Sequence, residues 1–296
     1  MSTQRNRVLS VKEAGNFLIN YQGLNTACRY TQEKGVISYF EKVGCIQYDP
    51  LNVVGRNADL TLQSRVKGYH ADMLYKLLYQ KRTVIDAWDK MMALYLQKDW
   101  PYFKRLRASK GKEIEAVLAR RNSLQALEHL DEVREHIKKH GPSQSSSIDI
   151  GVCNPGKWGS KKLASAAMDY LFNIGELGIY SKNNVQRTYE FTEKLLKKEI
   201  LEESDPFQSD DEFYEWYVKR RIGSVGMLWA CNGGGWLGHF ISDSDIRNSK
   251  IKRLLEKGEI EEFYVESVKN PFYIRSEDTE YLNKKSTKKE VKFLAP

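Results

Sequence analysis

Gln47 and Asp49 stand two residues apart in the run 45–50, which reads CIQYDP. Alternate side chains of a β-strand share a face, so this pair would point one way while Ile46 and Tyr48 point the other. Pro50 cannot donate to a strand ladder and marks the end of the strand. A carboxylate beside an amide can hold and activate a water molecule. Taken alone, such a pair is more often a turn cap and a solvated amide, so the local pattern leaves both interpretations open.

Two arginines follow this candidate strand. The segment from Leu51 leads to Arg56 and into a helix that is expected to end near Ser64, where Arg65 follows. A guanidinium can bind a DNA phosphate, and an ordinary surface position explains either arginine equally well. Arg56 and Arg65 are therefore candidate DNA-binding residues, together with Tyr48 in the strand.

The candidate strand is expected to follow directly on a helix that ends in glycine. A helical pattern over 34–43 ends at Gly44, before the strand begins. The same pattern recurs around Gly175 and Gly258: an apolar residue, three other residues, glycine, one other residue and an aliphatic residue. We expect each of these three glycines to close a helix in a left-handed conformation, after which the chain enters a strand.

The second and third copies of this pattern continue into β-hairpins. Helix, strand, turn and strand follow one another in both copies: 160–174, 177–180, 182–184 and 186–191, then 248–257, 259–266, 269–270 and 272–274. This is the order of the recognition helix and wing of a winged helix, a module that commonly binds DNA. The alternative is coincidence, because a helix followed by glycine and a strand is a common connection.

The sequence therefore predicts a mainly α protein with small β-hairpins, an α+β fold, built of tandem winged helix-turn-helix modules. Residues 1–140 would form a divergent first unit with the candidate strand and a basic helical region. Residues 141–205 would form the second winged helix with its wing hairpin. Residues 206–296 would form a third, winged-helix-like unit.

Composition limits the partners of the chain. Its 296 residues include 47 Lys and Arg against 39 Asp and Glu, a formal net charge of +8 that is typical of proteins that meet polyanions. No apolar run approaches the roughly 20 residues of a membrane helix, and the first residues lack the apolar core of a signal peptide. The four cysteines are scattered, and His136 and His140 supply too few ligands for zinc. We expect a cytoplasmic protein with reduced thiols, no membrane contact, no metal and no cofactor.

Basic residues gather at further places that are candidates for DNA contact. Residues 97–121 hold eight Lys or Arg against three acids, either as a surface that tracks phosphates or as a solvated helix face. Lys161 and Lys162 open the predicted recognition helix. A hairpin tip can enter a minor groove, and four residues lie at the predicted wing tip: Lys182, Asn183, Asn184 and Arg187.

Taken in order, these segments resemble the YcaQ-like (AlkX/AlkZ) winged-helix DNA glycosylase family. The resemblance starts from the Gln-x-Asp motif of Gln47 and Asp49, which is short, and gains specificity from the ordered set. The further segments that agree are Gln22-Gly23-Leu24, Ser64-Arg65, Gly141-Pro142, Lys157-Trp158-Gly159, Gly175-Glu176-Leu177, Gln186-Arg187, Tyr189, Thr192-Glu193 and Phe293-Leu294-Ala295-Pro296. The match spans almost the whole chain.

The resemblance implies an enzyme that hydrolyses the N-glycosidic bond of N7-alkylated purines and unhooks DNA interstrand crosslinks. Asp49 would stabilise the oxocarbenium-like sugar and activate water, and Gln47 would orient that water. The enzyme would be a monofunctional, monomeric glycosylase that acts on damaged double-stranded DNA. The alternatives are a non-catalytic winged-helix DNA-binding protein, such as a transcriptional regulator, and a protein-interaction scaffold.

The sequence departs from the family pattern in two places. Many members carry a His-Glu pair after a tryptophan, whereas Trp88 is followed here by Asp89 and Lys90, so the role of that pair is not transferred to Asp86 or Asp89. The chain also stops at Pro296, where relatives continue with an acidic and aromatic segment. We therefore expect a shortened gene product.

Overall fold

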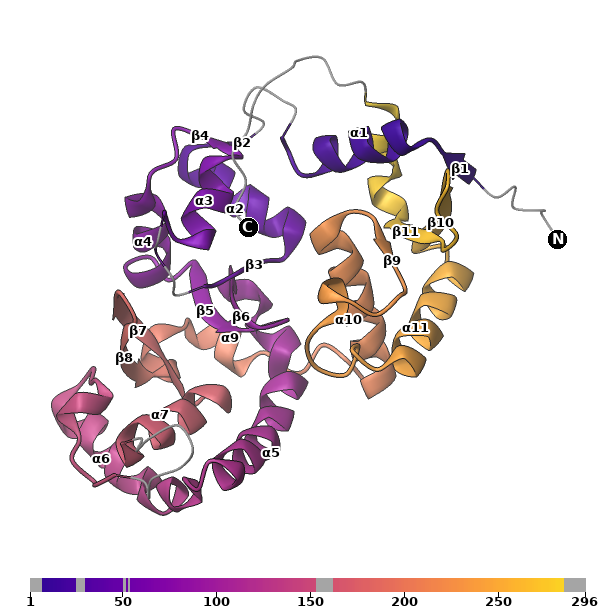
Figure 1. The fold of residues 1–296 in the computed structure, drawn as a ribbon. Coiled ribbons are helices and arrows are strands. Elements are labelled where there is room, and N and C mark those ends of the chain that lie inside the picture. The colour runs from indigo at the N-terminus through magenta and orange to yellow at the C-terminus, as the bar shows by residue number, and fades with distance from the viewer. Residues whose placement is uncertain (1–6, 25–29, 50–51, 53, 153–161, 285–296) are drawn as a thin grey trace. The chain divides into compact units, whose positions relative to one another are not determined.

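The structure is a computed structural model that describes residues 7–24, 30–49, 52, 54–152 and 162–284 (Figure 1). The chain folds into two compact units. Unit 1 comprises Met1–Tyr75, Asp89–Leu96 and Phe207–Pro296, and unit 2 comprises Lys76–Trp88 and Gln97–Pro206. The modules 1–140, 141–205 and 206–296 follow another division of the chain, and they remain a prediction.

Unit 1 contains both ends of the described chain and most of the strands. Its elements are β1 (Arg7–Leu9), α1 (Val11–Tyr21), β2 (Tyr30–Thr31), α2 (Gln32–Val43), β3 (Cys45–Gln47), α3 (Asn57–Gln63), β4 (Val66–Lys67), β6 (Met92–Leu96), α10 (Asp210–Val225), β9 (Leu228–Trp229), η4 (Gly234–Trp236), α11 (Ser244–Glu256), β10 (Ile260–Val265), β11 (Phe272–Arg275) and η5 (Ser276–Asn283). Helix α4 (Ala71–Tyr79) begins in unit 1 and ends in unit 2.

Unit 2 is mostly helical and has one hairpin. Its elements are β5 (Val84–Trp88), η1 (Gln97–Phe103), α5 (Lys104–Arg120), η2 (Leu124–His129), α6 (Leu130–His140), η3 (Ser145–Ser147), α7 (Leu163–Asn173), β7 (Leu177–Asn183), β8 (Gln186–Phe191), α8 (Thr192–Leu195) and α9 (Lys198–Glu202).

The core of unit 1 joins segments that are far apart in the sequence. Strand β1 pairs in parallel with β10, with Arg7 opposite Phe263, in a sheet of strand order β1-β10-β11-β9. Phe17 and Tyr21 of α1 lie in one buried cluster with Phe263 and Ile274 of that sheet. Burial of such large side chains stabilises the fold by about 2 kcal/mol each, so the amino-terminal helix is an integral part of this unit.

The core of unit 2 forms around α7, which is buried along most of its length. Its alanine-rich sequence presents Ala166, Ala167 and Leu171 to one apolar cluster, which also contains Leu177 and Tyr189 of the β7–β8 hairpin. Small side chains let neighbouring elements approach closely. The hairpin is therefore packed on the helix that precedes it.

The three repeated glycines have the positive φ angles that the sequence predicts. Gly44, Gly175 and Gly258 have φ angles of 78°, 85° and 69°. They follow α2, α7 and α11, and a strand begins one or two residues later in each case. This arrangement confirms the expected helix, glycine and strand order. The fold is mainly helical with sheets of two to four strands, and none of the described helices is long and apolar enough to span a membrane.

Candidate active site

Strand β3 and the two residues after it hold the candidate catalytic pair in unit 1. It pairs antiparallel with β6, with Ile46 opposite Leu94 and Gln47 opposite Ala93. The ladder extends one residue further, because the Tyr48 amide donates to the Met92 carbonyl over 2.9 Å. Strand β3 is therefore fixed along its whole length, up to the residue before Asp49.

The side chains of this segment alternate in burial as predicted. Ile46 and Tyr48 are buried, with 5% and 9% of their surface exposed, whereas Gln47 is exposed and Asp49 is half-buried. The apolar members of the run therefore anchor the strand in the core. Gln47 and Asp49 are the polar members that remain accessible, which is the condition for contact with a substrate. Tyr48, a predicted DNA-binding residue, is among the anchors.

Asn57 is a residue at this site that the sequence did not single out. It is the first residue of α3, and its Nδ2 donates to the Gln47 carbonyl over 3.2 Å. Asparagine is common at helix starts, but its contact ten residues back along the chain gives no sequence signal. The hydrogen bond ties the start of α3 to the end of β3.

Arg56 and Arg65 flank α3 in the structure. Arg56 precedes the helix and is half-buried. Arg65 donates to the Thr61 carbonyl over 3.0 Å, and its guanidinium lies 5.4 Å from the centre of the Tyr39 ring. Arg65 is thus held partly within unit 1. Phosphate contact by either arginine remains a prediction.

The two carboxylates near Trp88 lie in separate, buried ion pairs. Asp86, on β5 in unit 2, pairs with Lys182. Asp89, in unit 1, binds Arg220 over 3.2 Å and Arg221 over 3.1 Å. Burial opposes ionisation, but the two guanidinium groups hold the pKa of Asp89 below its usual value. Neither carboxylate is exposed, since both are at most 6% accessible, and this agrees with leaving the role of the family His-Glu pair unassigned.

The predicted wing is the β7–β8 hairpin, and one of its expected DNA-binding residues lies in an internal ion pair. Asn183 and Asn184 are exposed at the turn, as predicted for a tip. Lys182, however, is 9% exposed because its ammonium group turns inward to Asp86. Strand β7 continues through Asn183, and alternation places the neighbouring side chain on the inner face. Lys182 therefore supports the hairpin from within, and its contact with DNA remains a prediction.

Arg187 follows the turn on the returning strand. It is half-buried, and its Nη1 lies 3.5 Å from Asp169 Oδ1 and 3.4 Å from the Tyr189 hydroxyl. These residues line a polar cavity of about 380 Å³ within unit 2, together with Gln144, Ser145, Ser146, Ser165, Val185 and Gln186. The cavity offers hydroxyl, amide and guanidinium groups, which are the groups that bind phosphate and sugar oxygens.

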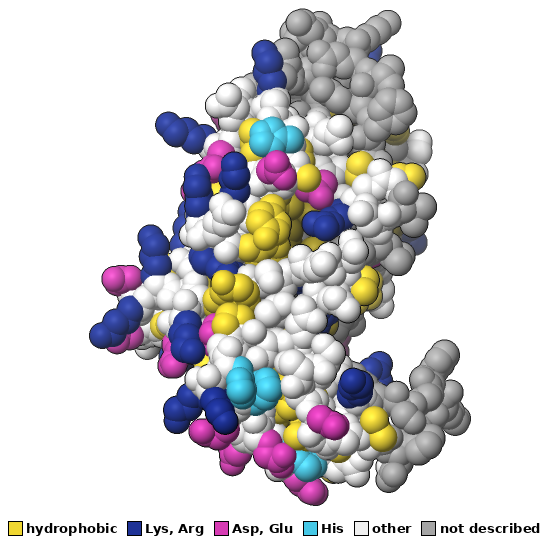
Figure 2. Space-filling model, turned by 90° about the vertical axis from the view of Figure 1, so that its left-hand side faces the viewer, with side chains coloured by type: hydrophobic (Ala, Val, Ile, Leu, Met, Phe, Trp, Pro, Cys, Tyr) yellow, Lys and Arg dark blue, Asp and Glu magenta, His cyan; other side chains and the backbone are white. Residues whose placement is uncertain are grey.

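The remaining basic candidates divide between surface and interior. Lys162 is exposed at the start of α7, and Lys161 lies outside the described residues. In the region 97–121, Arg107 stacks on Trp100 at 3.7 Å and Lys110 lies 4.3 Å from the Trp88 ring centre. Figure 2 shows Lys and Arg side chains interspersed with carboxylates on one face of the protein. Arg107 and Lys110 thus place their charges against aromatic rings of unit 2.

Among the residues that the structure describes, no group of three or more His, Cys, Asp or Glu side chains is placed to hold a metal ion. Among the described residues 45–49, Gln47 is exposed and Cys45 and Asp49 are partly exposed.

Comparison with known proteins identifies the class to which this fold and site belong. A family model described as DNA glycosylase AlkZ-like matches residues 40–296. The chain belongs to the AlkZ-like DNA glycosylase family. Its fold is similar to that of the Streptomyces sahachiroi DNA glycosylase AlkZ, with a TM-score of 0.59 and 14% sequence identity over 93% of this chain and 72% of that chain.

Proposed function

We propose that this protein hydrolyses the N-glycosidic bond of N7-alkylated purines in double-stranded DNA and unhooks interstrand crosslinks made through such bases. Membership of a DNA glycosylase family supports the reaction class. The observation that carries the proposal is the end of β3, where Gln47 is exposed and Asp49 half-buried beside two buried anchors.

The chemistry of the lesion suits one carboxylate and one amide. Alkylation at N7 leaves the purine positively charged, so it departs without a general acid. The sugar that remains is oxocarbenium-like, and it needs a nearby negative charge and a water molecule. Asp49 stabilises the cation and accepts a proton from water, while the Gln47 amide orients that water through its donor and acceptor groups. The reaction needs no amine nucleophile, so the enzyme is monofunctional.

Crosslink unhooking requires a site that the tethered base can reach. Flipping into a deep pocket is the usual route of base-processing enzymes, but a base bonded to the opposite strand cannot follow it. A strand end with an exposed Gln47 suits a base that stays in the duplex.

DNA binding is assigned to tandem winged helices. In the second, α7 is the recognition helix and β7–β8 is the wing, with Asn183 and Asn184 at its tip. In the third, α11 is followed by β10 and β11 in the same order. Lys162 and Arg187 are the basic candidates for phosphate contact. The protein acts as a monomer on chromosomal DNA in the cytoplasm.

The test is base release from duplex oligonucleotides that contain either one N7-methylguanine or one nitrogen-mustard crosslink. We expect wild type to release the base and to separate the crosslinked strands. Gln47→Ala and Asp49→Asn should bind both duplexes normally but react more slowly. Tight binding to undamaged DNA without base release by the wild type would instead favour a regulator.

A further inference from the structure

The start of strand β3 is fixed by a side chain from a distant part of unit 1. Gly44, which turns the chain from α2 into β3, has a positive φ of 78°. Its carbonyl accepts a hydrogen bond of 2.8 Å from Arg220 Nη2, and Arg220 lies on α10, 176 residues further along the chain. A helix end leaves its last carbonyls without intrahelical donors, so this guanidinium takes the place of a helical partner.

Asp89 fixes the orientation of that guanidinium. Its Oδ2 accepts from Arg220 Nε over 3.2 Å, and its Oδ1 accepts from Arg221 over 3.1 Å. Asp89 also helps to raise the pKa of the thiol of Cys45, the first residue of β3. With 1% of its surface exposed, the carboxylate is held in one arrangement. Asp89 is therefore linked to the glycine that precedes β3 through Arg220.

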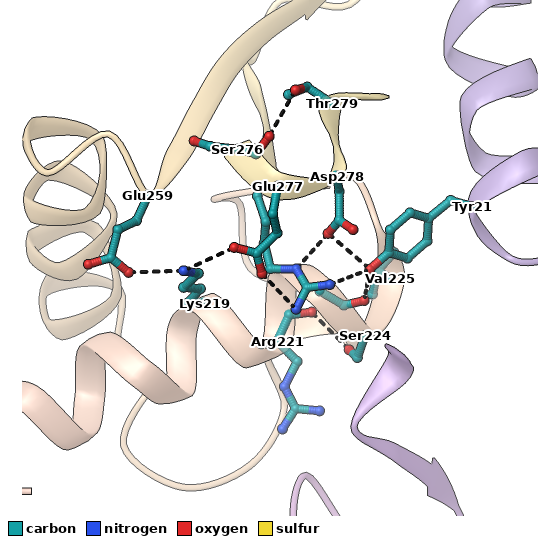
Figure 3. Close-up of polar contacts among 12 residues, drawn as sticks. Tyr21, Lys219, Arg221, Ser224, Val225, Glu259, Ser276, Glu277, Asp278 and Thr279 are labelled. Carbon is teal, nitrogen blue, oxygen red and sulfur yellow. Dashed lines mark hydrogen bonds and ion pairs between the residues drawn. The ribbon is translucent and has the colours of Figure 1, made fainter. Parts of the chain in front are cut away.

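Helix α10 is itself fixed from its other side. Lys219 lies 3.1 Å from Glu259 and 3.3 Å from Glu277, and the Tyr21 hydroxyl donates to the Gly223 carbonyl over 2.6 Å. Figure 3 shows these contacts, with the Arg221 side chain extending away from them. The helix thus connects the carboxyl-terminal strands and η5 with the start of β3.

We propose that Arg220 and Asp89 are positioning residues that set the placement of Gln47 and Asp49. The inference rests on the proposed function of these two residues. Gln47 and Asp49 follow Gly44 by three and five residues, so a shift or rotation at the glycine would be carried along the short strand to both. Misplacement of a reacting group by 1 Å can lower a rate by about 10²-fold. The carboxyl-terminal part of unit 1 thereby acts on catalysis without touching the substrate.

The test compares Arg220→Gln with Arg220→Lys and with a control variant on α11. The shorter, uncharged side chain of Arg220→Gln cannot donate to both Asp89 and the Gly44 carbonyl. Arg220→Lys keeps the positive charge and a single donor group. Lys252→Gln is the control, because it makes the same change of charge at an exposed position of α11 in unit 1. Three quantities are measured: single-turnover release of N7-methylguanine, affinity for the damaged duplex, and hydrogen exchange of the backbone amides of residues 44–48.

We expect Arg220→Gln to lower the release rate by about 10- to 100-fold, with affinity for the duplex unchanged. Amide exchange in 44–48 should accelerate at least tenfold, while exchange in β7 and β8 stays as in wild type. Arg220→Lys should recover part of the rate, and Lys252→Gln should match wild type in rate and in exchange. If Arg220 only stabilised the fold, amide exchange would accelerate equally throughout unit 1. It would then show no selective increase at residues 44–48.

Unchanged exchange at 44–48 in Arg220→Gln overturns the positioning role, whatever the activity. A wild-type rate in Arg220→Gln, with accelerated exchange, also overturns it, because the strand would then move without consequence. If wild type itself releases no base, the proposed function fails. The exchange measurement still decides whether Arg220 holds the strand.

Discussion

At the residue scale, Asp49 differs from the other carboxylates near it by its surroundings. Asp86 and Asp89 are buried, and each is neutralised by a neighbouring cation. A carboxylate in such a pair cannot approach a sugar without leaving its partner uncompensated. Asp49 lies at a strand end and is only half-buried. Accessibility, rather than residue type, therefore selects it as the candidate catalytic group.

The buried pair of Lys182 and Asp86 makes a prediction about stability. Lys182→Met would leave the Asp86 carboxylate buried without its counter-charge, and we expect a loss of about 3–5 kcal/mol in the free energy of unfolding. The double variant Lys182→Met with Asp86→Leu should recover much of that loss. Urea denaturation of the single and double variants measures both effects. A double variant no more stable than Lys182→Met would contradict a direct pairing.

The thiol of Cys45 is predicted to be unreactive at ordinary pH. Burial, with a contribution from Asp89, raises its pKa to about 12. Only the thiolate is alkylated, and the thiol keeps its proton at every pH well below that value. At pH 8 iodoacetamide should therefore leave the Cys45 peptide unmodified in the native protein and label it in urea, as measured by mass spectrometry. Equal labelling of native and unfolded protein would contradict this environment.

At the element scale, the repeated junctions of helix, glycine and strand differ in what packs against the glycine. Gly44 has Arg220 packed against it, so that a Cβ atom would lie 2.9 Å from the guanidinium carbon. A Cβ atom at Gly258 would meet no atom within 4 Å. A positive φ is common to the three junctions, and Gly175 also meets an arginine, since a Cβ atom there would lie 2.5 Å from Arg107 Cδ. The contact at Gly44 lies at the junction that starts the candidate catalytic strand.

This difference predicts unequal effects of the same substitution. Gly258→Ala should cost about 1 kcal/mol of stability, the price of a left-handed backbone alone. Gly44→Ala adds a clash with Arg220, so we expect a larger loss and a slower release of N7-methylguanine. Thermal unfolding and single-turnover kinetics of the two variants test this ordering. Equal losses of stability, with equal rates, would exclude a special role for the Gly44 junction.

Local elements could be predicted from the sequence because their signals are local. Gly44, Gly175 and Gly258 end helices as expected, and Ile46 and Tyr48 are buried while Gln47 is exposed. The pairing of β3 with β6 could not be predicted, since Gln47 and Ala93 are linked by no pattern in a single sequence. The inward turn of Lys182 was missed for the same reason: its partner Asp86 lies 96 residues away.

At the scale of the whole molecule, the units are assembled from separated segments. The predicted boundaries at 140 and 205 came from patterns along the chain, which describe contiguous modules. Unit 1 instead joins Met1–Tyr75 with Phe207–Pro296, because β1 completes the sheet of β10 and β11. The residues proposed for catalysis thus share a unit with the carboxyl-terminal segment, as the role of Arg220 requires.

The distribution of charge predicts how DNA affinity responds to salt. The net charge of +8 overstates the cations available to DNA, because Lys110 and Lys182 are buried. Each phosphate contact contributes about 0.9 to the slope of log affinity against log salt. Lys162→Ala should lower that slope by about one contact, whereas Lys182→Met, measured where it is folded, should leave it unchanged. A reduced slope in Lys182→Met would show that its ammonium group reaches DNA.

The central claim is that Asp49 performs the reaction, and single-turnover release of N7-methylguanine from a duplex tests it most directly. Wild type, Asp49→Asn and Asp72→Asn should be compared at saturating protein. Asp72 is an exposed carboxylate at the start of α4, so its variant controls for the loss of one charge. We predict release by wild type and Asp72→Asn, and a rate lower by about 10²- to 10⁴-fold for Asp49→Asn with duplex binding retained. Release by Asp49→Asn at the wild-type rate would contradict the account.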